Sequence, residues 1–127
     1  MFCMILKNVL LVVRDMERSR RFYQEVLGLK VTADFGEKVI FAGGVVLEKG
    51  HLWEDALKVQ VSYEGNNAEL YFEDSDIESI RRRLEGSDYE VDFLMEQNEN
   101  PAEVIRFYDP DGHIIEVKGY RAVSTIH

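Results

Sequence analysis

The sequence predicts an α+β protein made of two βαβββ repeats, and three observations support this fold class: an internal repeat, the hydrophobic pattern and the chain length. The segment Asn8–Asp15 has its counterpart in Glu69–Asp76, 61 residues later. The segment Gly43–Glu48 has its counterpart in Asp111–Glu116, at a shift of 68. At 127 residues and 46% hydrophobic, the chain can bury one core but is too short for two ordinary domains. The two halves are therefore expected to share one core within a single domain, residues 1–127.

The first repeat, about residues 1–50, is expected to contain a strand, a helix and three further strands. Val9–Val13 is a continuous run of valine and leucine, which is typical of a strand buried on both faces. Asp15 can cap the helix that follows and Gly28 can end it, with apolar residues at helical spacing between them. The remaining strands are expected at Val31–Phe35, Lys38–Phe41 and Val45–Glu48, separated by glycine turns.

The second repeat, about residues 68–127, is expected to follow the same order after a linker of about residues 51–67. Glu69–Glu73 alternates polar and apolar residues, as a half-buried strand does. Ser75 and Glu78 have the spacing of a capping box, and Gly86 can end the helix. The apolar stripe of that helix and the last three strands are expected at Ile77, Ile80 and Leu84, and at Tyr89–Met95, Glu103–Tyr108 and His113–Lys118.

Polar residues at equivalent strand positions form the candidate site. If the halves pair by pseudo-symmetry, Asn8 meets Glu69 and Glu48 meets Glu116. Three carboxylates and an amide would then gather, and buried carboxylates are costly unless they are paired, protonated or bound to a cation. Oxygen donors favour Mg²⁺, Mn²⁺ or Ca²⁺ over Zn²⁺. The alternative is that these glutamates lie on a solvated face of the sheet without a special role.

Composition and charge exclude several classes of protein. The formal net charge of −9, from 24 acidic and 15 basic residues, argues against a nucleic-acid surface. The chain carries no P-loop, dinucleotide fingerprint or other motif for an organic cofactor. A single cysteine, Cys3, excludes an intramolecular disulfide framework, and the sequence has neither a signal-peptide pattern nor an apolar run of membrane-spanning length. The sequence thus predicts a soluble, cytoplasmic protein.

Three segments resemble the superfamily of glyoxalases, bleomycin-resistance proteins and extradiol dioxygenases, which is also called the vicinal oxygen chelate fold. They are Asn8–Asp15, Ser19–Gly28 and Phe107–Glu116, the last reading Phe-Tyr-Asp-Pro-Asp-Gly-His-Ile-Ile-Glu. The resemblance covers nearly the whole chain. It implies paired βαβββ modules that form a cupped mixed sheet around a small-molecule site, usually in a homodimer.

The resemblance also implies metal positions, and this chain departs from the family pattern at two of them. Enzymes of the family commonly have His or Gln where this chain has Asn8, and His where it has Glu69; Glu116 matches, and Glu48 matches a nearby polar position. Without the two imidazoles, the donors that suit Zn²⁺, Ni²⁺ and Fe²⁺ are missing. His113 belongs to the turn motif of the family, and we expect it to hold that turn rather than to act in catalysis.

Two functions follow from this resemblance. The first is a glyoxalase-like lyase or isomerase, in which Mn²⁺ or Mg²⁺ assists proton transfer by Glu116 or Glu69. The alternative is a metal-free protein of the bleomycin-resistance type, which binds or sequesters a small molecule. Fold alone does not choose between them.

Overall fold

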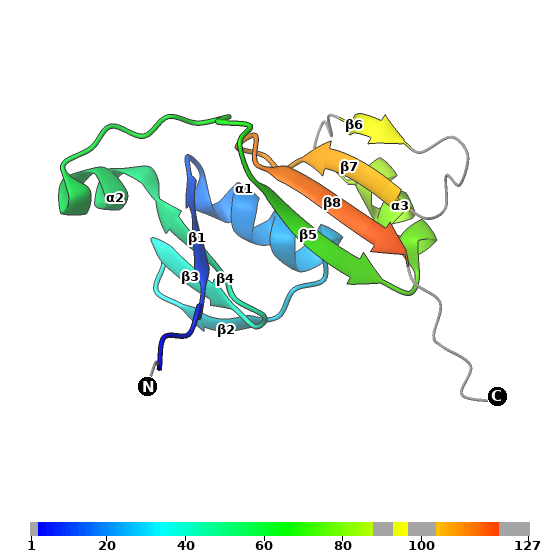
Figure 1. The fold of residues 1–127 in the computed structure, drawn as a ribbon, viewed down its shortest axis with the longest axis horizontal. Helices are drawn as coiled ribbons and strands as arrows, with labels where there is room; N and C mark the ends of the chain where they lie inside the picture. The colour runs from blue at the N-terminus through cyan, green and yellow to red at the C-terminus, as the bar shows by residue number, and fades with distance from the viewer. Residues whose placement is uncertain (1–2, 88–92, 97–103, 120–127) are drawn as a thin grey trace. The chain divides into compact units, whose positions relative to one another are not determined.

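Two four-stranded mixed sheets with the same topology form the protein (Figure 1). The structure, a computed structural model, describes residues 3–87, 93–96 and 104–119. The chain divides into two compact units, Met1–Tyr63 and Glu64–His127, with one sheet in each. The α+β class and the two βαβββ repeats are confirmed, because the strand orders β1-β4-β3-β2 and β5-β8-β7-β6 are equivalent.

The first unit contains four strands in a sheet, one helix that changes its winding, and a second helix. The central strand β4 pairs in parallel with β1 and antiparallel with β3. The bounds are β1 Val9–Val13, α1 Met16–Arg21, a π-helical turn η1 Phe22–Val26, β2 Val31–Asp34, β3 Lys38–Phe41, β4 Val45–Lys49 and α2 Gly50–Leu57.

The core of the first unit lies between the sheet and the α1–η1 helix. Asp15 caps α1 as expected, because its Oδ1 accepts a hydrogen bond from the backbone N–H of Arg18 at 3.1 Å. Gly28, at φ +73°, supplies the left-handed residue that follows the helix. The side chains buried in this core are Leu11, Val13, Met16, Phe22, Tyr23, Val26, Val39, Phe41, Val45 and Leu47, whereas Val46 is buried on the opposite face of the sheet.

The helix α2 lies in the segment that the sequence pattern leaves only as an apolar linker. It begins directly after β4 and ends at Lys58, which adopts the left-handed conformation at φ 58°. The chain then turns back, and the Glu54 side chain accepts a hydrogen bond from the backbone N–H of Val61 at 2.9 Å. The guanidinium of Arg14 packs over the ring of Tyr63, with Arg14 Cζ 3.9 Å from the ring centroid. The end of this segment is therefore held against the first unit.

The second unit repeats the arrangement around the parallel pair β5 and β8. The apolar stripe of α3 is confirmed, because Ile77, Ile80 and Leu84 are buried. The other side of this core comes from Ile105, Phe107, Ile115 and Val117 on the sheet. The bounds are β5 Glu69–Asp74, α3 Ile77–Glu85, β6 Phe93–Glu96, β7 Val104–Tyr108 and β8 Ile114–Gly119; part of the predicted strand Tyr89–Met95, residues 89–92, lies outside the described residues.

The capping box expected for α3 is wrong. Asp76 is the N-cap: its carboxylate accepts hydrogen bonds from the backbone N–H of Ser79 at 3.1 Å and from the Ser79 hydroxyl at 2.5 Å. The strand β5 runs through Asp74, so the helix begins one residue later than a cap at Ser75 requires. The bonds from Ser79 lower the pKa of Asp76, so the cap stays charged to lower pH than an unbonded carboxylate.

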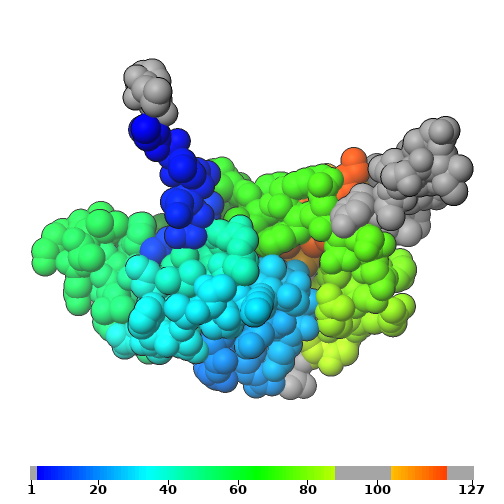
Figure 2. Space-filling view, turned by 90° about the horizontal axis from the view of Figure 1, so that it is seen from below, coloured from blue at the N-terminus to red at the C-terminus, as the bar shows by residue number. Residues whose placement is uncertain are grey.

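The segment before β1 exposes several large apolar side chains. Met4, Ile5 and Leu6 are 94%, 72% and 84% exposed, and this stretch stands out from the surface in Figure 2 (dark blue). None of the helices in the described part of the chain is long and apolar enough to cross a membrane.

Candidate functional site

The two glutamates predicted to be catalytic lie on the same face of the second sheet, the face turned away from α3. Side chains alternate along β5 and β8, so Glu69 and Glu116 point to the opposite side from the buried Ile115 and Val117. We call this surface the β5–β8–β7 face. Its members are Glu69, Tyr71, Glu73, Val104, Arg106, Tyr108, Ile114, Glu116 and Lys118.

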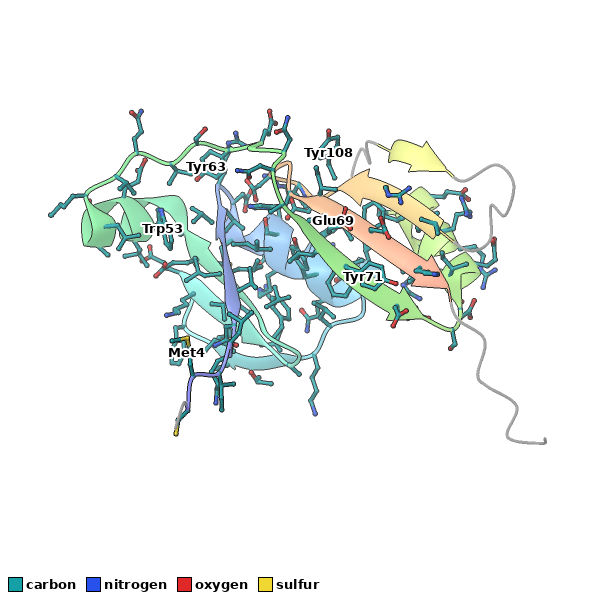
Figure 3. The ribbon with its side chains drawn as sticks, in the orientation of Figure 1. Met4, Trp53, Tyr63, Glu69, Tyr71 and Tyr108 are labelled. Carbon is teal, nitrogen blue, oxygen red and sulfur yellow. The ribbon has the colours of Figure 1, made fainter. Side chains whose placement is uncertain are left out.

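The strand register fixes the neighbours of Glu116 on this face. Tyr71 lies opposite it on β5, and Arg106 lies opposite it on β7. Glu69 is paired with Ile114 and therefore lies two residues, or about 7 Å, along the strands from the level of Glu116. Figure 3 shows Glu69 and Tyr71 on β5 and Tyr108 on β7.

Glu116 is held in an ion pair with Arg106. The Arg106 Nε donates a hydrogen bond to Glu116 Oε1 at 2.6 Å. The side chain of Glu116 is only 13% exposed and that of Arg106 is 31% exposed. A carboxylate that is largely removed from water needs a cation close by, and the chain itself supplies one.

Tyr71, which lies beside this ion pair, has a raised pKa. The Tyr71 hydroxyl donates to Glu73 Oε2 at 3.1 Å. Partial desolvation, this hydrogen bond and the negative charges of Glu73 and Glu116 all raise the pKa of Tyr71. The raised pKa keeps this phenol a hydrogen-bond donor to higher pH than an ordinary tyrosine, and its ring is half-exposed on the face.

The turn between β7 and β8 is organised by a buried carboxylate. Asp109 Oδ1 accepts hydrogen bonds from the backbone N–H groups of Asp111 at 2.9 Å and His113 at 2.8 Å. Its Oδ2 lies 2.7 Å from His113 Nδ1. The expectation that His113 holds this turn agrees with these contacts, and the turn fixes the start of the strand that carries Glu116.

The first unit does not bring its two predicted site residues together. Glu48 is paired with Val12, whereas Asn8 precedes β1, four residues or about 13 Å away along the strand. Glu48 shares its face with Val12, Val46 and Ile40, and Lys38 lies opposite it on β3. Its surroundings are thus more apolar than those of Glu116.

The register also corrects the equivalence of Asn8 and Glu69. Val46 and Ile114 are related by the shift of 68, and their partners are Leu10 and Glu69. Leu10 therefore stands at the level of Glu69. The helix cap Asp76 lies seven residues after Glu69, whereas the helix cap Asp15 lies five residues after Leu10. The 61-residue repeat, which aligns the two caps, therefore misaligns the strands by two positions. A shift of two leaves the face unchanged.

The residues present fit a divalent metal poorly. Within each unit, the described residues contain no group of three His, Cys, Asp or Glu side chains arranged to hold a metal ion. At Glu116 a metal would have to share a carboxylate that already accepts the Arg106 hydrogen bond, and it would stand beside a fixed positive charge. The donor set of this face therefore disfavours a cation at the carboxylate where the family pattern puts one.

Comparisons with known proteins agree on the fold. The model of the glyoxalase-like domain family matches residues 6–120. A protein of unknown function from Agrobacterium tumefaciens is 32% identical, with a TM-score of 0.78 over 94% of this chain and 97% of that one. A search of curated proteins finds no match.

Two solved structures with stated activities are more distant. One is the fosfomycin resistance protein FosX from Listeria monocytogenes, as a mutant complexed with Mn(II) and 1S,2S-dihydroxypropylphosphonic acid; it is 17% identical, with a TM-score of 0.70 and coverage of 94% of each chain. The other is lactoylglutathione lyase from Agrobacterium tumefaciens, 19% identical, with a TM-score of 0.63 and coverage of 91% of this chain and 92% of that one. These two show a shared fold, and the family match over residues 6–120 shows that the chain belongs to the glyoxalase-like domain family.

Proposed function

We propose that this chain binds a small molecule without a metal ion, on the β5–β8–β7 face. The observation that carries the proposal is the 2.6 Å hydrogen bond from Arg106 to Glu116. A carboxylate that ligates a metal must offer its lone pairs to the ion, but this one is already neutralised by a guanidinium. The face combines two tyrosine rings, an ion pair and the apolar side chain of Ile114, which suits recognition of an organic ligand.

Metal analysis tests the proposal. Protein purified without chelator is expected to contain far less than one equivalent of Mn, Mg, Zn or Ni, and its melting temperature should not rise when these ions are added. Arg106→Gln frees Glu116, so this variant should gain a melting shift with Mn²⁺ that the wild type lacks. Lys38→Gln, which changes the corresponding position of the first unit, is the matched control and should show no such gain. Stoichiometric metal in the wild type that is lost in Glu116→Gln would overturn the proposal.

That contrary result would support a second function, metal-assisted proton transfer by a lyase or isomerase. It is favoured by the position of Glu69 and Glu116 on one face, where either carboxylate could move a proton. The fold shared with the Mn(II)-bound FosX makes Mn²⁺ or Mg²⁺ the ion to test first. In that case Asn8 and Glu48 would have to complete the site, as the predicted pairing of the two halves requires.

We also propose that the protein is a cytoplasmic homodimer. Strands β1 and β5 lie at the edges of their sheets, and within the described residues each pairs with one neighbouring strand. The segment with the exposed side chains of Met4, Ile5 and Leu6 ends two residues before β1, and a dimer would cover these side chains. Light scattering should give twice the chain mass of 14.8 kDa. A monomer at all concentrations from micromolar to millimolar would contradict this.

A further inference from the structure

Arg106 has hydrogen-bond donors that its ion pair does not use. It donates to Glu116 through Nε, so this bond leaves the end-on fork of the guanidinium, formed by N–H groups of Nη1 and Nη2, to another acceptor. Among the residues that the structure describes, Glu116 is the acceptor that the Arg106 side chain contacts. A planar fork of donors on a one-third exposed guanidinium matches the two oxygens of a carboxylate.

The surface next to this fork is aromatic and apolar. Tyr108 follows Arg106 by two residues on the same face of β7, and Ile114 lies opposite Tyr108 on β8. Tyr71 stands on the far side of Glu116, on β5. A flat ring placed over Ile114 would therefore lie between Tyr71 on one neighbouring strand and Tyr108 on the other.

The charges on the face limit the ligand to a single negative group. Glu116 already shares the guanidinium of Arg106, and Glu69 and Glu73 lie along β5. A doubly charged phosphate would meet these carboxylates with no further cation than Lys118, which is paired with Glu73 across the strands. Glu69, at the corner opposite Arg106, can instead accept a hydrogen bond from a hydroxyl or amino group.

We propose that this face binds a monoanionic aromatic carboxylic acid. Its carboxylate would accept hydrogen bonds from the Nη groups of Arg106, and its ring would lie over Ile114 between Tyr71 and Tyr108. A hydroxyl or amino group of the ligand would donate a hydrogen bond to Glu69. Glu116 is a positioning residue, because its bond to Nε orients the fork. The inference rests on the proposed metal-free function and adds the class of ligand. Because Glu116 also withdraws positive charge from Arg106, its replacement by glutamine leaves an Nε acceptor and strengthens the attraction for an anion.

Saturation-transfer NMR and calorimetry with 4-hydroxybenzoate, on chelator-treated protein, test the inference. The acid should bind at least about tenfold more tightly than its neutral isostere 4-hydroxybenzamide, since one charge-assisted fork is worth about that factor or more. Arg106→Gln should weaken binding of the acid by a similar factor, and Arg106→Lys, which keeps the charge but not the fork, by less. Tyr108→Ala should weaken binding of the acid and of the amide equally. Glu116→Gln keeps an acceptor for Nε but removes a negative charge, so it should bind the acid more tightly than the wild type and the amide no more tightly.

The outcomes separate this inference from the function on which it rests. If metal-free protein binds acid and amide alike, ignores Arg106→Gln, or binds neither at millimolar concentration, the ligand class is wrong and the metal-free function stands. If binding appears only after Mn²⁺ is added and disappears in Glu116→Gln, both fall. Circular dichroism of each variant confirms that the sheet is intact.

Discussion

Replacing Phe41 with alanine is expected to lower the free energy of unfolding by about 3–5 kcal/mol, the usual range for a large aromatic side chain removed from a core. Phe41 is 2% exposed on β3, and its ring centroid lies 6.0 Å from that of Tyr23 on the helix. The loss combines the lost transfer of the ring from water with the cavity left between sheet and helix. Urea unfolding should show a lower midpoint with little change in slope.

Two variants define what this result means. Phe41→Leu keeps most of the volume and should cost about 1 kcal/mol. Phe35→Ala removes a ring that is 71% exposed and should change stability by less than about 0.5 kcal/mol. If Phe41→Ala were as mild as Phe35→Ala, the packing of the first unit would have to differ from that described.

Replacing Asp109 with alanine should cost about 3 kcal/mol. The substitution leaves the buried N–H group of Asp111 and the part-buried N–H group of His113 without their acceptor, and each buried unsatisfied group costs about 1–3 kcal/mol. The β7–β8 turn would loosen, and with it the alignment of Arg106 and Glu116. Thermal unfolding followed by circular dichroism measures the loss.

Asp109→Asn is the matched control. Its Oδ1 still accepts from both backbone groups, and its amide can face Nδ1 of a neutral His113 imidazole. We expect it to lose less than half as much stability as the alanine variant. Equal losses in the two variants would show that the negative charge, rather than the pair of backbone hydrogen bonds, stabilises the turn.

Hydrophobic periodicity predicted most elements within one or two residues. The strands Val9–Val13 and Lys38–Phe41 have the predicted bounds, and Asp15, Gly28 and Gly86 lie at helix ends as expected. These features are local, because alternation, caps and glycines act through neighbouring residues.

The features that were missed depend on tertiary contacts or on competition between near-equal local choices. Helix α2 lies against strands β4 and β1, which are tertiary contacts that the hydrophobic pattern of the linker does not display. In it, Leu52, Trp53, Ala56 and Leu57 recur at helical spacing, so that spacing was the available signal. At α3, Asp76 and Ser75 are both good caps, and the length of β5 decides between them.

The candidate site could be predicted only in part. Strand parity turned Glu69 away from the core and put Glu116 on the face of Ile114, and the register of β5 and β8 places both glutamates on one face of the second sheet. Arg106 was missed because cross-strand neighbours depend on the hairpin register, which the sequence pattern alone did not supply. The common site for Asn8, Glu48, Glu69 and Glu116 remains a prediction.

Each hairpin places a basic residue opposite its glutamate, ten positions earlier in the chain. Lys38 faces Glu48 and Arg106 faces Glu116 across antiparallel strands. The second of these pairs is an ion pair, because Arg106 is hydrogen-bonded to Glu116, and a chain with a neutral residue at that position would leave the carboxylate without its counter-ion. On the metal-free function proposed above, we expect the residue ten places before this glutamate to differ between metal-dependent and metal-independent members of the family.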